Sequence, residues 1–194
     1  MLSQQPKAAV AGLVALAAFT LWITWRAKLI EITMQGRGAE THLVNKPAPD
    51  FSLAALDGHA VSPADFRGKQ KLVITFWASW CGPCKLELPA LRTFYQQNRQ
   101  VAGNQFEILA ISIDAERSEA ESYANTEKLP FPILLDPLHR AADAYTVDSI
   151  PTLFVIDKSG KVVYGHVGFD MIVQETLKRQ LEVGNSVTVR GALH

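Results

Sequence analysis

The chain of 194 residues contains only two cysteines and has no excess of charge of either sign. Nineteen Lys and Arg residues balance nineteen Asp and Glu residues, so the basic surface expected of a nucleic-acid-binding protein is missing. Internal repeats and low-complexity tracts are also absent, which disfavours a repeat architecture. We therefore expect a globular protein that does not bind nucleic acid.

Both cysteines, Cys81 and Cys84, lie in the stretch FWASWCGPCKLELPAL, residues 76–91. A structural zinc site needs four ligands, commonly a second Cys-x-x-Cys pair or two spaced histidines. The chain has no third cysteine, and its histidines lack that spacing, so we expect no metal and no cofactor. A structural disulfide is disfavoured because closing so short a loop constrains little of the unfolded chain. The pattern therefore favours a reactive dithiol.

Cys81 lies where a buried strand, predicted over 72–77, gives way to a helix predicted over 82–98. Unpaired backbone N–H groups and the positive end of the helix dipole stabilise a thiolate at such a junction. Cys84, one turn further along, is placed to attack a mixed disulfide formed on Cys81. We predict that Cys81 is the nucleophile and Cys84 the resolving thiol of a redox-active disulfide.

Apolar runs rich in β-formers alternate with helical patterns over the rest of the chain. Further strands are predicted over 106–113, 132–135, 152–156 and 161–167, and further helices over 116–128, 139–145 and from Asp170 onward. Asp170 is expected to be the N-cap of the last helix, with Met171, Val173, Leu177 and Leu181 among its apolar positions. This order predicts an α/β domain, a mixed central sheet with helices on both faces.

Residues 8–25 carry no charge, and as a helix they would extend about 27 Å, close to the ~30 Å hydrocarbon core of a bilayer. Trp22 and Trp25 lie where an interfacial aromatic belt is expected. We predict a single membrane-spanning helix in contact with lipid. A buried globular helix and a signal peptide cleaved after Ala15–Ala17 are the alternatives. The flanking basic residues do not favour an inside N-terminus, so the charge bias leaves the orientation open.

The predicted layout has four parts. Residues 1–28 form the membrane anchor, 29–45 a linker, 46–183 the folded domain and 184–194 a C-terminal tail.

Residues 77–84, reading WASWCGPC, resemble the active site of the thioredoxin superfamily. Pro89 occupies the place of the proline that kinks the superfamily's active-site helix. Ile150-Pro151-Thr152 resembles its cis-proline loop, and Gly168 follows the last hairpin, where the superfamily also has a glycine. The likeness implies a thioredoxin-like fold.

The segments 48–58 and 66–69 resemble the N-terminal hairpin of the membrane-anchored TlpA/ResA/CcmG-like branch, and 114–147 resembles that branch's inserted βα unit. The resemblance implies an extracytoplasmic thiol-disulfide oxidoreductase on the bacterial inner (cytoplasmic) membrane, with its domain in the periplasm. It further implies that the enzyme reduces disulfides in client proteins, for example apocytochrome c during cytochrome c biogenesis. Its electrons would then come from a transmembrane donor of the thiol-relay type.

Glu87, three residues after Cys84, shares roughly the same helix face as the dithiol. It is either an exposed helix glutamate or, as in the resembling branch, an acid that assists proton transfer. Thr75 stands where thioredoxin has a buried aspartate, so a general base is missing from that position. The resemblance also assigns client binding to five residues, Trp80, Gly82, Pro83, Ile150 and Pro151, although Trp80 could equally be ordinary packing.

Two other functions remain open on the sequence. The opening Ala48–Phe51 is shared with peroxiredoxins, but these place Thr or Ser three residues before the reactive cysteine, where this chain has Ala78. A docking or chaperone module with an incidental dithiol is the other alternative.

Overall fold

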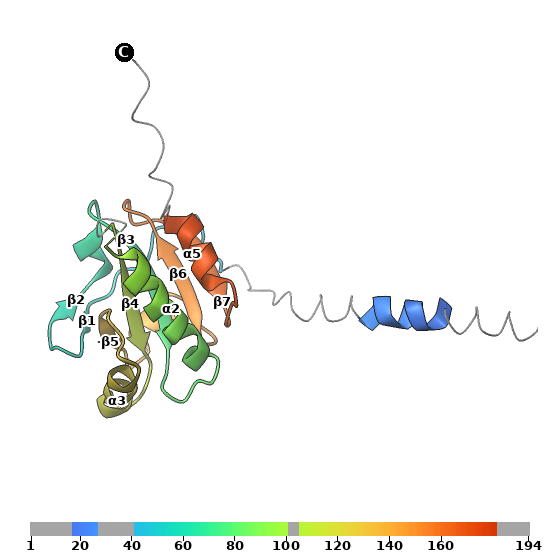
Figure 1. Ribbon diagram of the computed structural model, residues 1–194. Helices are drawn as coiled ribbons and strands as arrows, with labels where there is room; N and C mark the ends of the chain where they lie inside the picture. Colours follow the sequence, from blue (N-terminus) through green and yellow to red (C-terminus); the bar gives the residue numbers. More distant parts are fainter. Residues whose placement is uncertain (1–16, 27–40, 101–104, 182–194) are drawn as a thin grey trace, which may run out of the picture. The chain divides into compact units, whose positions relative to one another are not determined.

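A computed structural model of the chain describes residues 17–26, 41–100 and 105–181 (Figure 1). The chain divides into two units, Met1–Arg37 and Gly38–His194. In the first unit, residues 17–26 are helical and their side chains are exposed. Within the described ranges, no helix combines the length and the apolar character needed to cross a membrane. The predicted span over 8–25 begins outside these ranges, and most of the predicted linker and the whole tail lie outside them.

The second unit is built on a five-stranded sheet with the order β5-β4-β3-β6-β7 (Figure 1). Strand β3 (Lys71–Trp77) pairs in parallel with β4 (Phe106–Ser112), and β4 pairs in parallel with β5 (Ile133–Leu135). Strands β6 (Thr152–Ile156) and β7 (Val162–Val167) form an antiparallel hairpin that continues the sheet beyond β3. The apolar runs of β3 and β4 are buried on both faces, as expected for central strands. The predicted mixed sheet is confirmed.

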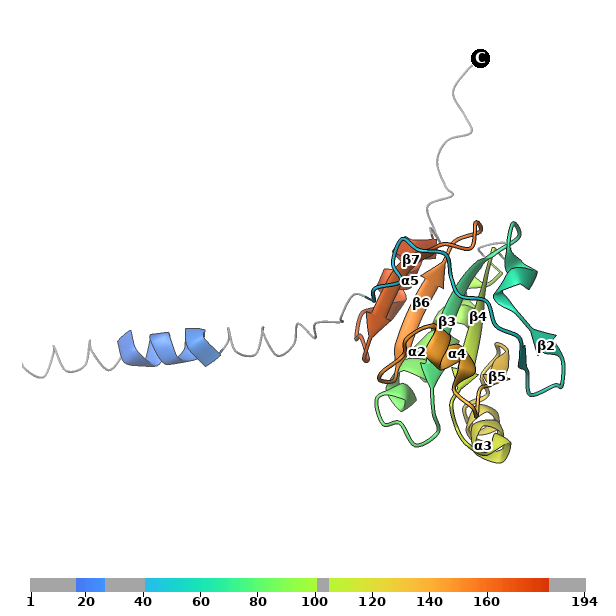
Figure 2. The ribbon, with the colours of Figure 1, turned by 180° about the vertical axis from the view of Figure 1, so that it is seen from behind.

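Helices cover both faces of this sheet, as predicted. Three of them, α2 (Cys84–Asn98), α3 (Arg117–Glu127) and α5 (Val173–Leu181), bury side chains in a core on one face. Helix α4 (Arg140–Ala144) contributes to a second core on the opposite face, which is turned toward the viewer in Figure 2. The active-site helix α2 therefore packs directly on the face of β3 that carries Val73 and Trp77.

The two additions that the family resemblance implied are both present. An antiparallel hairpin joins β1 (Leu53–Ala54) to β2 (Ala60–Val61), and a short 3-10 helix, η1 (Pro63–Phe66), follows it. The stretch 114–147, which resembles the inserted unit, contains α3, β5 and α4. The hairpin forms a two-stranded sheet of its own, and an isolated bridge between Ala55 and Leu134 joins it to β5.

Two predicted details differ from the structure. Met171 is 82% exposed rather than part of the buried face of the last helix. The reason is that Asp170 accepts the backbone N–H of Ile172 at 2.9 Å, so residues 171–172 form a turn and α5 begins only at Val173. Residues 41–45, predicted as linker, pack on the domain, because Leu43 enters the second core and the N–H of Asn45 donates to the carbonyl oxygen of Val162.

Candidate active site

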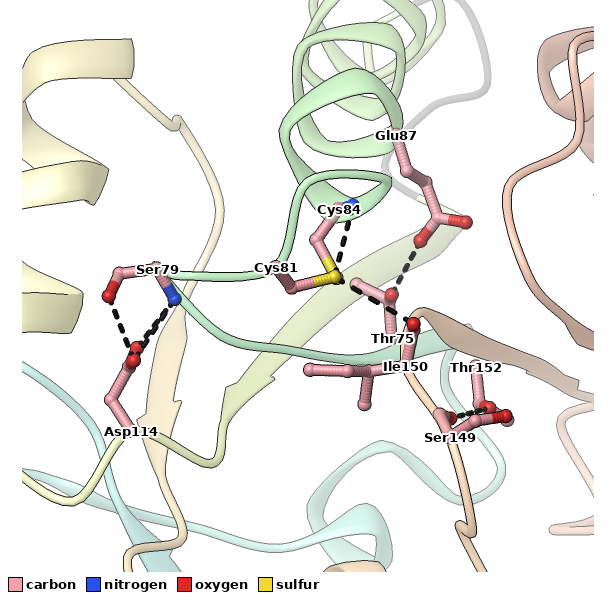
Figure 3. The surroundings of a disulfide bond; sticks show 9 residues. All are labelled: Thr75, Ser79, Cys81, Cys84, Glu87, Asp114, Ser149, Ile150 and Thr152. Atoms are coloured by element: carbon pink, nitrogen blue, oxygen red, sulfur yellow. Dashed lines mark hydrogen bonds between the residues drawn. A yellow bond between two sulfur atoms is a disulfide. The ribbon is translucent and has the colours of Figure 1, made fainter.

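Cys81 and Cys84 are joined by a disulfide at the start of α2 (Figure 3). The backbone N–H of Cys84 donates to Sγ of Cys81 at 3.2 Å, so a free helix donor does meet this sulfur, as the sequence predicted. Such a donor stabilises a thiolate when the disulfide is reduced. Cys81 is 5% exposed and Cys84 is fully buried. Of the two sulfurs, that of Cys81 is therefore the one an incoming protein can reach.

The loop before β6 faces the disulfide. Its Ile150–Pro151 peptide bond is cis, which confirms the prediction from the Ile-Pro-Thr resemblance. The carbonyl oxygen of Ile150 lies 3.7 Å from Sγ of Cys81. The carbonyl oxygen of Pro151 accepts the N–H of Gly168 at 2.7 Å, and Gly168 has a φ of 92°, a conformation that glycine adopts readily. The cis-proline loop is thus fastened to the end of β7.

Glu87 is buried, with 1% of its surface exposed, so its alternative interpretation as an exposed helix residue is wrong. Figure 3 shows its side chain reaching from α2 to the hydroxyl of Thr75, which donates to Oε1 at 2.7 Å. Among the described residues, Oε2 has no hydrogen-bond partner. Burial raises the pKa of Glu87 to about 7, the Thr75 hydrogen bond opposes this shift, and the charge of Asp170 adds to it. Glu87 can therefore both hold and release a proton near neutral pH.

Asp114 is a site residue that the sequence did not reveal. It is 3% exposed, and its carboxylate accepts the N–H of Ser79 at 3.0 Å, the hydroxyl of Ser79 at 2.9 Å and that of Ser112 at 2.8 Å. These bonds fix the loop that leads into Cys81 (Figure 3). One signal was available: Asp114 follows β4, and the ends of parallel neighbouring strands meet at one edge of a sheet.

The surface around Cys81 is partly apolar. Trp80 is 65% exposed, and Gly82 and Pro83 are also exposed. Trp77, by contrast, is fully buried against Tyr123, with ring centroids 5.2 Å apart. The two tryptophans that flank Ala78–Ser79 therefore have different roles, since only Trp80 is available to another molecule.

Comparisons with known proteins agree with this geometry. Residues 44–165 match the model of the AhpC/TSA family. The thiol-disulfide oxidoreductase ResA of Geobacillus kaustophilus is 35% identical over 139 residues, which are 72% of this chain and 76% of ResA. The thioredoxin-like protein YneN of Bacillus subtilis is 39% identical over 124 residues, 62% of this chain and 69% of YneN. The crystal structure of a candidate thiol:disulfide interchange protein DsbE from Chlorobium tepidum is 32% identical, with a TM-score of 0.65, over 72% of this chain and 95% of that one.

A thioredoxin-like fold with this dithiol and these relatives defines a thiol-disulfide oxidoreductase. Its clients are proteins that carry thiols or disulfides. The chain belongs to the AhpC/TSA family and within it is TlpA/ResA/CcmG-like, as the sequence motifs indicated.

Proposed function

We propose that this oxidoreductase reduces disulfides in client proteins outside the cytoplasm, while tethered to the membrane by its N-terminal segment. The observation that carries the catalytic part is the position of Cys81. Its sulfur accepts a helix N–H, lies beside the cis-proline loop and is the less buried member of the pair.

The exchange proceeds in two steps. The thiolate of Cys81 attacks one sulfur of the client disulfide, and the other client sulfur leaves with the bonding electrons and takes up a proton. The thiolate of Cys84 then attacks Sγ of Cys81, which closes the Cys81–Cys84 disulfide and releases the second client sulfur as a thiol. The client gains two electrons and two protons, and the enzyme loses the same number. Glu87, the buried acid of this site, takes the proton of Cys84 before the second attack.

The client chain docks on the surface around Cys81 in this proposal. The exposed ring of Trp80 and the exposed Gly82–Pro83 turn supply apolar contact, and the backbone of Ile150–Pro151 aligns the client strand. The carbonyl oxygen of Ile150 lies close to the reacting sulfur, which supports this arrangement.

The direction of electron flow can be tested by the redox potential. The Gly-Pro dipeptide between the cysteines is that of thioredoxin, whose potential is about −270 mV. We expect a similar value for the purified chain equilibrated in thiol–disulfide buffers, together with steady turnover in an insulin-disulfide reduction assay. Cys81→Ser is the control, since it should abolish both signals.

A potential near that of a strong oxidase, about −120 mV, would contradict the reductase assignment. The opening Ala48–Phe51, which is shared with peroxiredoxins, makes a thiol peroxidase the second candidate function. Ala78 is fully buried and offers no hydroxyl at the position where a peroxidatic site places Thr or Ser. Turnover of hydrogen peroxide faster than turnover of insulin disulfides would favour the peroxidase.

The proposed location is the bacterial inner membrane, with residues 8–25 in the lipid and the catalytic domain in the periplasm. Reduction in that oxidising compartment requires a transmembrane electron donor, and an apocytochrome c awaiting haem attachment is a suitable client. A membrane-impermeant thiol reagent applied to intact cells should then label reduced Cys81. Labelling only after lysis would place the domain in the cytoplasm.

A further inference from the structure

The hydrogen bond between Thr75 and Glu87 links the central strand to the active-site helix. Thr75 is fully buried on β3, on the face that carries Val73 and Trp77 toward α2. Its hydroxyl donates to Oε1 of Glu87 at 2.7 Å, across a separation of twelve residues (Figure 3). The position that lacks a general base is thus in direct contact with the buried acid of the site.

The two oxygens of Glu87 have different surroundings. Oε1 is held by Thr75, while Oε2 is buried without a hydrogen-bond partner among the described residues. When a proton binds to Oε2, Oε1 remains a carbonyl oxygen and still accepts the bond from Thr75. The same rotamer of Glu87 is therefore stabilised in its charged and in its neutral form, and Oε2 is the oxygen left to take the proton.

We infer that Thr75 is a positioning residue, which holds Oε1 of Glu87 and so keeps this carboxylate in one position while it takes the proton of Cys84. This inference rests on the proposed function, in which Glu87 takes that proton. The S–H bond of Cys84 breaks and an O–H bond forms on the carboxylate of Glu87. The electron pair left on sulfur then forms the bond to Sγ of Cys81, and the client sulfur departs with the pair of the broken disulfide.

The groups that surround Glu87 determine in which direction each substitution should shift its pKa. Asp170, from the turn before α5, and Tyr164, on β7, interact electrostatically with Glu87, and the two cysteines lie at the start of its own helix. Thr75 donates to the carboxylate and so lowers the pKa of Glu87, while the charge of Asp170 raises it. Loss of the Thr75 hydroxyl should therefore raise the pKa of Glu87, so that the ionised carboxylate, which accepts the proton, forms only at higher pH.

The experiment isolates the second exchange step. The purified, reduced full chain is mixed with a chromogenic aromatic disulfide, so that Cys81 first captures one aryl thiol and Cys84 then releases it. The rate of this release is measured against pH for the wild type and for Thr75→Val, which keeps the shape of the side chain. We expect the inflection due to Glu87 to move up by about one pH unit or more in Thr75→Val.

Matched variants separate positioning from packing. Thr75→Ser restores a hydroxyl and should restore the wild-type inflection, and Asp170→Asn should move it in the opposite direction. Thr176→Val changes another buried threonine, on α5, and should not move the inflection. In a Glu87→Gln background, Thr75→Val should have no further effect on the profile, because its action requires the carboxylate.

A Thr75→Val profile that superimposes on that of the wild type overturns the inference, as does an effect that persists in the Glu87→Gln background. Thermal unfolding of each variant shows whether it is folded, and Thr75→Ala, which also lacks the hydroxyl, supplies the same comparison if Thr75→Val is not folded. Failure of the wild type to reduce protein disulfides would instead overturn the proposed function. The two failures are distinguishable because the aryl disulfide assay uses no client protein.

Discussion

Cys84→Ser should convert the enzyme into a trap that holds its client on Cys81 as a mixed disulfide. The first exchange step uses only Cys81, whereas release of the client requires the sulfur of Cys84, which is fully buried behind it. Turnover in the insulin assay should fall to the uncatalysed background, a loss of roughly a thousand-fold or more. In cells, the covalent complex should accumulate and disappear on treatment with a reducing agent, and its client can be identified by mass spectrometry.

Cys81→Ser is the matched control for this trap. It retains Cys84, but that buried thiol should not capture clients. Accumulation of mixed disulfides in Cys81→Ser rather than in Cys84→Ser would contradict the assigned roles of the two cysteines. A docking or chaperone function makes a different prediction, since both variants would then support normal function in cells.

Glu87→Gln should remove the contribution of this buried acid to the pH dependence of the stability of the folded protein. Burial raises the pKa of Glu87 from 4.5 to about 7, so the folded state binds this proton more tightly than the unfolded state does. The resulting stabilisation is complete below pH 4.5 and is lost as the pH rises through 7. The difference between these two pKa values corresponds to about 3 kcal/mol of unfolding free energy. A glutamine does not titrate, so this contribution disappears in the variant.

The measurement is denaturant unfolding of the oxidised protein over a series of pH values. Relative to the wild type, Glu87→Gln should gain stability between pH 5 and pH 8. The exposed glutamate Glu119 provides a control, because Glu119→Gln should leave the pH dependence of the wild type unchanged. A constant difference between wild type and Glu87→Gln over this range would show that Glu87 is not buried as a proton-binding group.

The sequence was sufficient for the parts of the site that are local or that carry a family motif. The strand–helix junction indicated the reactivity of Cys81 without any tertiary information, because the free N–H groups belong to the first turn of the helix itself. Pro151 is a different case. Since only about 5–6% of X-Pro bonds are cis, its conformation was predictable only through the resemblance of the surrounding tripeptide.

The contacts that the sequence did not predict are those between distant parts of the chain. Thr75 was interpreted as the loss of an aspartate, and its contact with Glu87 became visible only when α2 was seen to pack on β3. Asp114 lies 35 residues from its partner Ser79, and its place after a strand indicates only the edge of the sheet at which it lies, not the loop that it binds. Met171 was predicted as an apolar position of the last helix from the sequence pattern, which does not show that the turn made by Asp170 delays the start of α5 to Val173.

The carboxylate of Asp114 has a consequence for attempts to transplant this chemistry. It fastens Ser79 to the end of β4. Thr75 on β3 contacts Glu87, and Ile150 in the loop before β6 contacts Cys81. A peptide of residues 76–91 contains both thiols and Glu87 but none of these three partners. Grafted onto another scaffold as a helix, it would keep the N–H of Cys84 that donates to Cys81 but would lose the fixed loop, the bond that holds Glu87 and the carbonyl oxygen beside Cys81.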